Sequence, residues 1–182
     1  MIAGRGIGRI AGIGLRTSAL ALVLAGCFLG DRDPPAGQPS FYRSLATHGA
    51  EVDLAAAQSM ISGYRRNNGL GPVTIDPMLT RLAQEQAQIM AERDKLDHSA
   101  GRPFQERIKT SGFDAKVAAE NISAGYHTLA EAFSGWRDSP PHRANMLLNG
   151  ATRIGIAAVY SPKSKFKVFW ALILAAPDER KI

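Results

Sequence analysis

Three side chains that can carry chemistry lie beside turn-forming or element-ending residues in the middle of the chain. They are His98, Glu120 and His142, and they are widely separated in sequence. Ionisable groups at the ends of helices and strands can converge in one cleft, which is where binding and catalytic groups tend to lie. This pattern predicts a fold in which three distant segments meet at one place.

Two of these residues belong to longer motifs. Glu120 begins a Glu-Asn-Ile sequence, and His142 lies in the pattern Trp-x-x-Ser-Pro-x-His-Arg-x-Asn that ends at Asn145. The pattern resembles the CAP superfamily, also called the SCP domain, which includes cysteine-rich secretory proteins, venom antigens, pathogenesis-related proteins and bacterial relatives. The resemblance covers roughly residues 54–177. It implies an α+β fold, a three-layer α-β-α sandwich with a small antiparallel sheet.

Apolar spacing and cap residues predict the order of the elements. Helical periodicity predicts a helix that begins at Leu54 and ends near residue 67, and Asp76 is the expected N-cap of a second helix. Glu131 stands three residues after Thr128, which is the capping-box spacing at the start of a later helix. The other expected elements are a short helix at 104–110, a strand at 116–123 and an antiparallel hairpin of 153–160 with 166–175.

The first 26 residues have the pattern of a targeting segment. Arginines precede an apolar run at 18–25 that is too short to span a bilayer. The run ends in Leu-Ala-Gly before Cys27, which resembles a bacterial lipobox and implies cleavage before Cys27 and lipidation of its sulfur. A plain secretory signal with an incidental cysteine is the alternative. We therefore expect a lipoprotein signal peptide at 1–26, a lipidated tether at 27–50 and a CAP/SCP domain at 51–182.

Charge and cysteine content narrow the function classes. Cys27 is the only cysteine, so no intramolecular disulfide can form. The formal net charge of +6 falls to about +3 when the three arginines of the predicted leader are removed. The remaining basic residues are dispersed and have no interleaved aromatic residues, so we expect no nucleic-acid partner. The expected partners are the membrane, through lipidated Cys27, and an unknown lipid, glycan or peptide ligand.

The resemblance also implies a site. CAP domains hold two histidines and two acidic residues in a shallow cleft, and His98, Glu120 and His142 match three of these positions. The position of the second acid, three residues after the tryptophan, is Ser139 here, and the neighbouring Asp138 would point differently. We include Asn145 among the expected cleft residues, and we expect its side chain to bond backbone in the turn after His142. Arg143 is expected to pair with Glu120 or Asp138.

Two interpretations of this cluster remain open from residue types. His98, His142 and Glu120 could ligate a divalent metal such as zinc, with water in the other positions. The same groups could instead form a hydrogen-bonded cluster that holds the loops together without any metal, and residue types favour this second interpretation. No cofactor is therefore certain.

The sequence favours a lipid-anchored envelope protein that binds a lipid, glycan or peptide in a cleft lined by histidine and glutamate. A metal-assisted hydrolase with Glu120 as its base is the alternative enzyme, and a structural protein with a vestigial cleft is a third possibility. The missing second acid disfavours hydrolysis more than binding. Phe28 after Cys27, rather than aspartate, favours the outer membrane where a cell has two, with the domain facing the periplasm or the cell surface.

Overall fold

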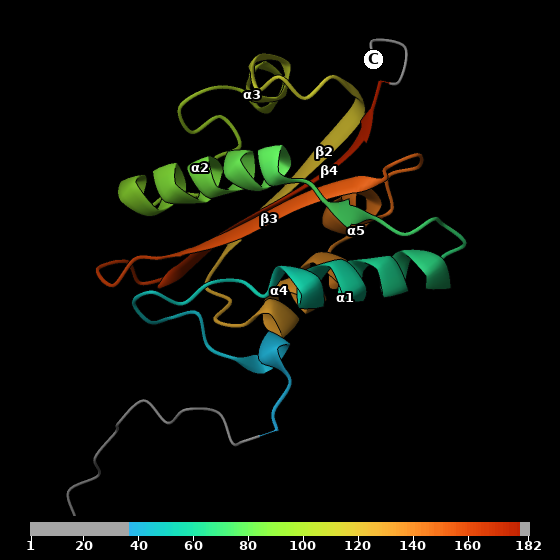
Figure 1. Ribbon diagram of the computed structural model, residues 1–182. Coiled ribbons are helices and arrows are strands. Elements are labelled where there is room, and N and C mark those ends of the chain that lie inside the picture. Colours follow the sequence, from blue (N-terminus) through green and yellow to red (C-terminus); the bar gives the residue numbers. More distant parts are fainter. Residues whose placement is uncertain (1–36, 179–182) are drawn as a thin grey trace, which may run out of the picture. The chain divides into compact units, whose positions relative to one another are not determined.

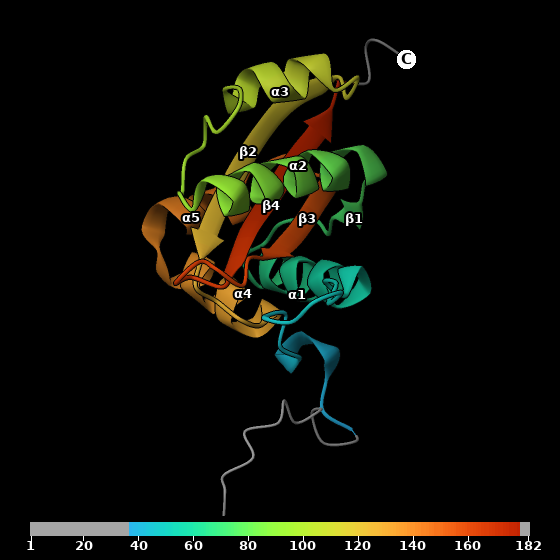
Figure 2. The same ribbon diagram turned by 90° about the vertical axis from the view of Figure 1, so that its left-hand side faces the viewer.

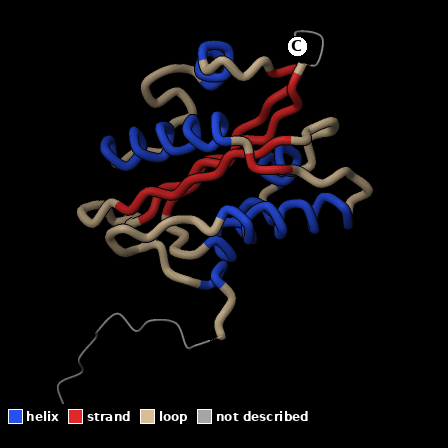
Figure 3. Tube along the Cα trace, in the orientation of Figure 1, coloured by secondary structure: helices blue, strands red, loops and turns tan. Residues whose placement is uncertain are grey.

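The computed structural model describes residues 37–178. The predicted signal peptide and Cys27 lie outside these residues. Figure 3 colours the described helices, strands and loops. In chain order they are η1 (Ser40–Tyr42), α1 (Leu54–Asn67), β1 (Thr74–Ile75), α2 (Pro77–Arg93), α3 (Phe104–Thr110), β2 (Ala115–Ala124), α4 (Leu129–Asp138), α5 (Pro140–Met146), β3 (Arg153–Tyr160) and β4 (Val168–Pro177).

A four-stranded sheet in the order β1-β3-β4-β2 forms the middle layer. β4 pairs antiparallel with both β2 and β3, and all of its residues except the last are buried. The predicted antiparallel hairpin is confirmed, although β4 begins at Val168 because Lys167 adopts a φ of 64° and cannot continue an extended strand. β1 adds a two-residue parallel pairing to the other side of β3, which the sequence pattern did not reveal.

Helices cover both faces of this sheet. α2 and α3 lie over one face, and α1, α4 and α5 lie over the other (Figures 1 and 2). Consecutive side chains of β4 alternate between two cores: Phe169 and Ile173 pack with the α2 side, whereas Trp170 and Leu172 pack with the α1 and α4 side. The expected three-layer α-β-α sandwich of the α+β class is confirmed.

Side-chain caps fix where two of the helices begin. Asp76 Oδ1 accepts hydrogen bonds from the backbone amides of Met78 (2.8 Å) and Leu79 (3.0 Å) at the start of α2. At the start of α4, Thr128 Oγ1 accepts from the amide of Glu131, and the Glu131 carboxylate accepts from the amide of Thr128. The predicted cap and capping box are confirmed, and they satisfy amides that have no partner within the helix.

A buried arginine connects α1 to the end of α5. The Arg65 side chain donates to the backbone carbonyls of Gly71 (3.0 Å), Met146 (3.0 Å), Leu148 (3.0 Å) and Ala151 (2.9 Å). Burial lowers the pKa of the Arg65 guanidinium. Because four carbonyl dipoles surround its charge, this side chain fixes the position of α5 relative to α1.

Packing begins earlier in the chain than the predicted boundary at residue 51. Leu45, inside the predicted tether at 27–50, is buried in the core on the α1 side. Its backbone amide donates to the carbonyl of His127 at 2.7 Å. The described part of that predicted tether therefore includes a segment of the folded domain. Leu45, whose adjacent residues are uncharged, packs there against the loop before α4.

Candidate functional site

Glu120 is the centre of the candidate site. It lies on β2, opposite Ile173 of β4, and its side chain is 1% exposed. Its Oε1 atom lies 2.9 Å from His98 Nδ1, and its Oε2 atom accepts a hydrogen bond from Arg107 Nη2 at 2.7 Å. Both carboxylate oxygens are thus engaged inside the protein, so this buried charge is compensated where it lies.

Arg107 is a site residue that the sequence analysis missed. Its α3 side chain is 3% exposed, and besides Glu120 it donates to the carbonyls of His98 and Arg102, each at 3.2 Å. Its guanidinium also lies 5.3 Å from the centre of the Phe104 ring. A buried glutamate requires a cation, but the cation sits on a different element, and nothing in the local sequence pointed to the pairing.

A network of asparagine side chains joins α5 to β2. Asn145 Nδ2 donates to the Glu120 carbonyl (3.1 Å) and to Asn121 Oδ1 (2.9 Å), while Asn121 Nδ2 donates to the His142 carbonyl (2.9 Å). α5 starts at Pro140, directly after α4 ends, because a proline is tolerated in the first turn of a helix. The break and the network together place His142 beside the end of β2.

The two histidines differ in environment. The His98 side chain is 53% exposed, whereas His142 is half-buried. Burial lowers the pKa of the His142 imidazole below its ordinary value of 6.5, and the nearby charge of His98 lowers it further. The structure thus brings His98 and Glu120 into direct contact. The backbone of His142 is held beside β2 by Asn121, and its imidazole interacts with His98 through charge alone.

The remaining expectations around the site did not all hold. The cation on Glu120 is Arg107, so the expected pairing of Arg143 with Glu120 is wrong. Asp138 pairs with Arg137 at 2.8 Å on the surface, and this bond, together with the charges of Arg137 and Arg143, lowers the pKa of the Asp138 carboxyl. Ser139 makes no side-chain cap hydrogen bond at the start of α5. Neither Asp138 nor Ser139 therefore supplies the second acid that the CAP resemblance implies.

The donor set does not fit a metal ion in this arrangement. Among residues 37–178, no group of three or more histidine, cysteine, aspartate or glutamate side chains is placed to hold one. The physical reason lies at Glu120, because its oxygens are occupied by an imidazole and by a guanidinium whose positive charge opposes a second cation. The hydrogen-bonded interpretation of the cluster fits the geometry better than the zinc interpretation.

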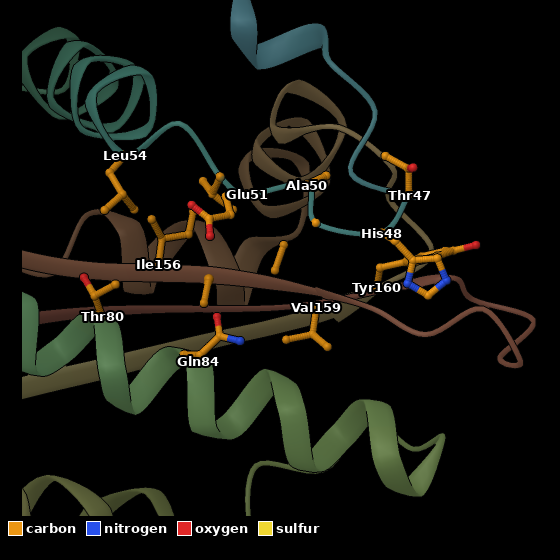
Figure 4. A pocket seen from close by; sticks show the side chains of 14 residues that line it. Thr47, His48, Ala50, Glu51, Leu54, Thr80, Gln84, Ile156, Val159 and Tyr160 are labelled. Atoms are coloured by element: carbon orange, nitrogen blue, oxygen red, sulfur yellow. The ribbon is translucent and has the colours of Figure 1, made fainter. Parts of the chain in front are cut away.

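Three cavities in the described domain lie away from this cluster. The first, of about 420 Å³, lies between the loop before α1 and α2 (Figure 4). The second cavity, of about 490 Å³, lies near the beginning of β2 and the end of β4. The third, of about 340 Å³, lies near α3 and the beginning of β2. None of the three is lined by His98, Glu120 or His142.

Both the fold and the site motifs are those of a CAP domain. Residues 58–174 match the model of the CAP family, the cysteine-rich secretory protein family. The chain belongs to this family. It is 36% identical over 140 residues to the uncharacterized protein YkwD of Bacillus subtilis, and the match covers 69% of this chain and 54% of YkwD. The chain thus spans about half the length of that relative.

Solved structures agree on the fold. An SCP-domain extracellular protein from Bacillus anthracis superposes with a TM-score of 0.59 at 18% identity, over 68% of this chain and 40% of the other. An outer surface protein from Borrelia burgdorferi superposes with a TM-score of 0.60 at 20% identity, over 71% of this chain and 99% of the other. At these identities the likeness concerns the fold alone.

Proposed function

We propose that this protein is a non-catalytic binding protein of the bacterial envelope, and that its exposed histidine cluster hydrogen-bonds a glycan. One observation carries the proposal: both carboxylate oxygens of Glu120 are engaged inside the protein, one with His98 and one with Arg107, and Glu120 acts by orienting His98. A buried residue that orients an exposed side chain shapes the surface that a ligand would contact. The proposal covers this domain and extends to no activity of the longer relatives.

The orientation of His98 determines what it offers to a ligand. Glu120 is paired with Arg107 and is a carboxylate, so it can only accept, and His98 Nδ1 must donate to it. In the neutral imidazole, Nε2 is then a hydrogen-bond acceptor on a side chain that is 53% exposed. The lowered pKa of His142 favours the neutral form of that second imidazole. A ring nitrogen that accepts hydrogen bonds suits the hydroxyl and amide donors of an acetylated sugar.

Hydrolysis fits this geometry less well. A general base must reach the proton that it removes, directly or through one water. Glu120 is 1% exposed, and its two carboxylate oxygens are already engaged by Arg107 at 2.7 Å and by His98 at 2.9 Å, so neither oxygen is free to reach a water or a substrate proton. The alternative of a vestigial cleft would leave the exposure of His98 without a purpose, and the binding experiment below separates it from our proposal.

An envelope location is part of the same proposal. The B. anthracis neighbour is named an extracellular protein and the B. burgdorferi neighbour an outer surface protein. Within residues 37–178, no helix is both long enough and apolar enough to cross a membrane. Attachment would come from lipidated Cys27, in agreement with the lipobox pattern that precedes it.

The test is a titration of the full chain with tri-N-acetylchitotriose, followed by the NMR signals of the histidine rings. We expect saturable shifts at His98 and His142, and weakening by about tenfold in His98→Ala, as expected for a lost hydrogen bond with an unpaired partner. His127→Ala is the matched control, because His127 is exposed on a loop outside the cluster. Equal weakening in the control, or no saturable shift, would overturn the proposal.

A further inference from the structure

The strand edge on the far side of the sheet from Glu120 is only partly covered. β1 pairs with Arg153 and Ile154 of β3 and with no further residue. Beyond Gly155, Ile156–Tyr160 of β3 has β4 on one side and no described strand on the other. An edge of this kind presents unpaired backbone donors and acceptors at regular spacing.

The hydrogen-bond pattern shows which backbone groups face the open side. The ladder with β4 continues to Ser161, whose amide donates to the Lys167 carbonyl, so Ala157 and Val159 also direct their backbone groups toward β4. The intervening residues of the strand face the other way, as the bond from the Asp76 amide to the Ile154 carbonyl demonstrates. The groups that face away from β4 belong to Ile156, Ala158 and Tyr160, of which Ile156 is buried and Ala158 and Tyr160 are half-buried, so the last two supply the accessible part of the edge.

The start of α2 explains why the edge is left open. The chain turns away from β3 at Asp76, which caps α2, so the parallel pairing stops after two residues. α2 then crosses the strand at Gly155, where an added Cβ atom would lie 2.1 Å from the carbonyl carbon of Leu79. Glycine allows this close approach, and the edge beyond it is left without a neighbouring strand.

This open edge lies in the cavity of about 420 Å³, within the size range of ligand sites. Figure 4 shows β3 running between the loop before α1, with His48 and Glu51, and α2, with Thr80 and Gln84. Glu51 is the one carboxylate among the lining residues, and none of them is lysine or arginine. The groove thus combines strand-like hydrogen-bonding groups with a single negative charge.

The two edges of the sheet differ in how they are protected. β2, at the opposite edge, carries Lys116 and a register shift between Ala115 and Val117, two features that discourage pairing with another strand. Ile156–Tyr160 contains no charged residue and no proline, and its register with β4 is uninterrupted. This segment keeps the features of a strand that can accept a partner.

We propose that the groove binds an extended peptide of another protein, which adds a strand to the edge of β3 and places a cationic side chain beside Glu51. Strand addition uses main-chain hydrogen bonds for affinity and side-chain contacts for selectivity. A second copy of this chain fits less well, because its own β3 edge lies between a loop and a helix in the same way. The proposal is independent of the histidine cluster.

The test uses fluorescein-labelled octapeptides that alternate valine and threonine and carry a single lysine. We expect saturable binding to the full chain. Methylating alternate backbone nitrogens keeps every side chain but removes the pairing amides, and it should weaken binding by about tenfold or more. No binding, or equal binding of the methylated peptide, would overturn the proposal.

Amide hydrogen exchange followed by NMR locates the contact. The bound peptide should slow exchange at Ala158 and Tyr160, whereas Ile156 is buried and Ala157 and Val159 already bond to β4. Glu51→Gln should weaken the lysine peptide about two- to fivefold, the range of an exposed ion pair, and Glu85→Gln, outside the groove, should not. Protection that appears without peptide as protein concentration rises would show a second copy as the occupant and overturn our choice.

Discussion

Glu120 shows how a single buried charge can organise a surface. Its carboxylate is buried between β2 and Arg107 of α3, yet through His98 it determines the tautomer of a side chain that is 53% exposed. Arg107 makes this arrangement stable, because an ionised carboxylate with 1% exposure would otherwise lack a compensating charge. The chemistry available at the surface therefore depends on an ion pair that a ligand never touches.

Removing the arginine from this pair should be costly. We expect Arg107→Met to lower the free energy of unfolding by about 3–5 kcal/mol, since it leaves a buried carboxylate without its partner. The double variant with Glu120→Gln should recover part of the loss. Urea denaturation measures both. Arg102→Met is the control, because that side chain is 50% exposed and its ion pair is worth at most about 1 kcal/mol. Equal losses in the two single variants would contradict the role given to Arg107.

His142 gives the site a dependence on pH. Its folded-state pKa lies below the ordinary 6.5, so below that pH the unfolded chain binds more protons than the folded one. Its contribution to stability is therefore complete above pH 6.5 and declines as the pH falls toward the lowered pKa. NMR titration should show this lowered pKa. His98→Ala should raise it only partway to 6.5, because burial is the larger cause; full restoration would contradict that order of causes.

At the scale of elements, short side-chain motifs decide where helices begin. Thr128 and Glu131 cap α4 as their spacing predicted, and Pro140 allows α5 to begin directly after α4. These signals are local, within four residues, which is why sequence reasoning could find them. Pairings between elements depend on how the layers are assembled, so they cannot be predicted from the spacing of residues that are close in sequence. The pairs of Arg107 with Glu120 and of β1 with β3 are examples.

The capping box can be tested by two substitutions that separate its halves. Thr128→Ala should lower the free energy of unfolding by about 0.5–2 kcal/mol, because the amide of Glu131 loses its acceptor. Glu131→Gln keeps an oxygen that can accept from Thr128 and should cost little. Thermal unfolding compares the two. A larger loss in Glu131→Gln would show that the charge of Glu131, rather than its hydrogen bonds, supports the helix.

At the scale of the molecule, the predicted anchor would keep the domain at a membrane surface. We expect Cys27→Ala to abolish incorporation of a labelled fatty acid and to release the protein from membranes or leave it unprocessed. The reason is that two or more acyl chains give stable attachment, each buried methylene adding about 0.8 kcal/mol. Labelling that persists in the variant would contradict lipidation at Cys27. Cys27 is the only cysteine, so no other thiol can take the label.

The candidate site could be predicted only where its members carry a motif. His98, Glu120, His142 and Asn145 were proposed from the sequence. In the structure His98 bonds to Glu120, and Asn145 and the backbone of His142 bond to β2, while their role as a ligand site stays a prediction. Arg107 had no motif around it. The open edge of β3 was also invisible, because it arises where the start of α2 interrupts a parallel pairing that the sequence pattern did not reveal.

The four carbonyl contacts of Arg65 bear on the order in which the protein is made. α1 leaves the ribosome early, but three of the acceptors of its guanidinium belong to Met146, Leu148 and Ala151, near the other end of the chain. Until those residues are synthesised, burial of the Arg65 guanidinium would leave its charge without three of its four hydrogen-bond acceptors. Nascent chains that lack them should therefore remain open to chaperones and proteases, and the domain should close only after most of its length has emerged.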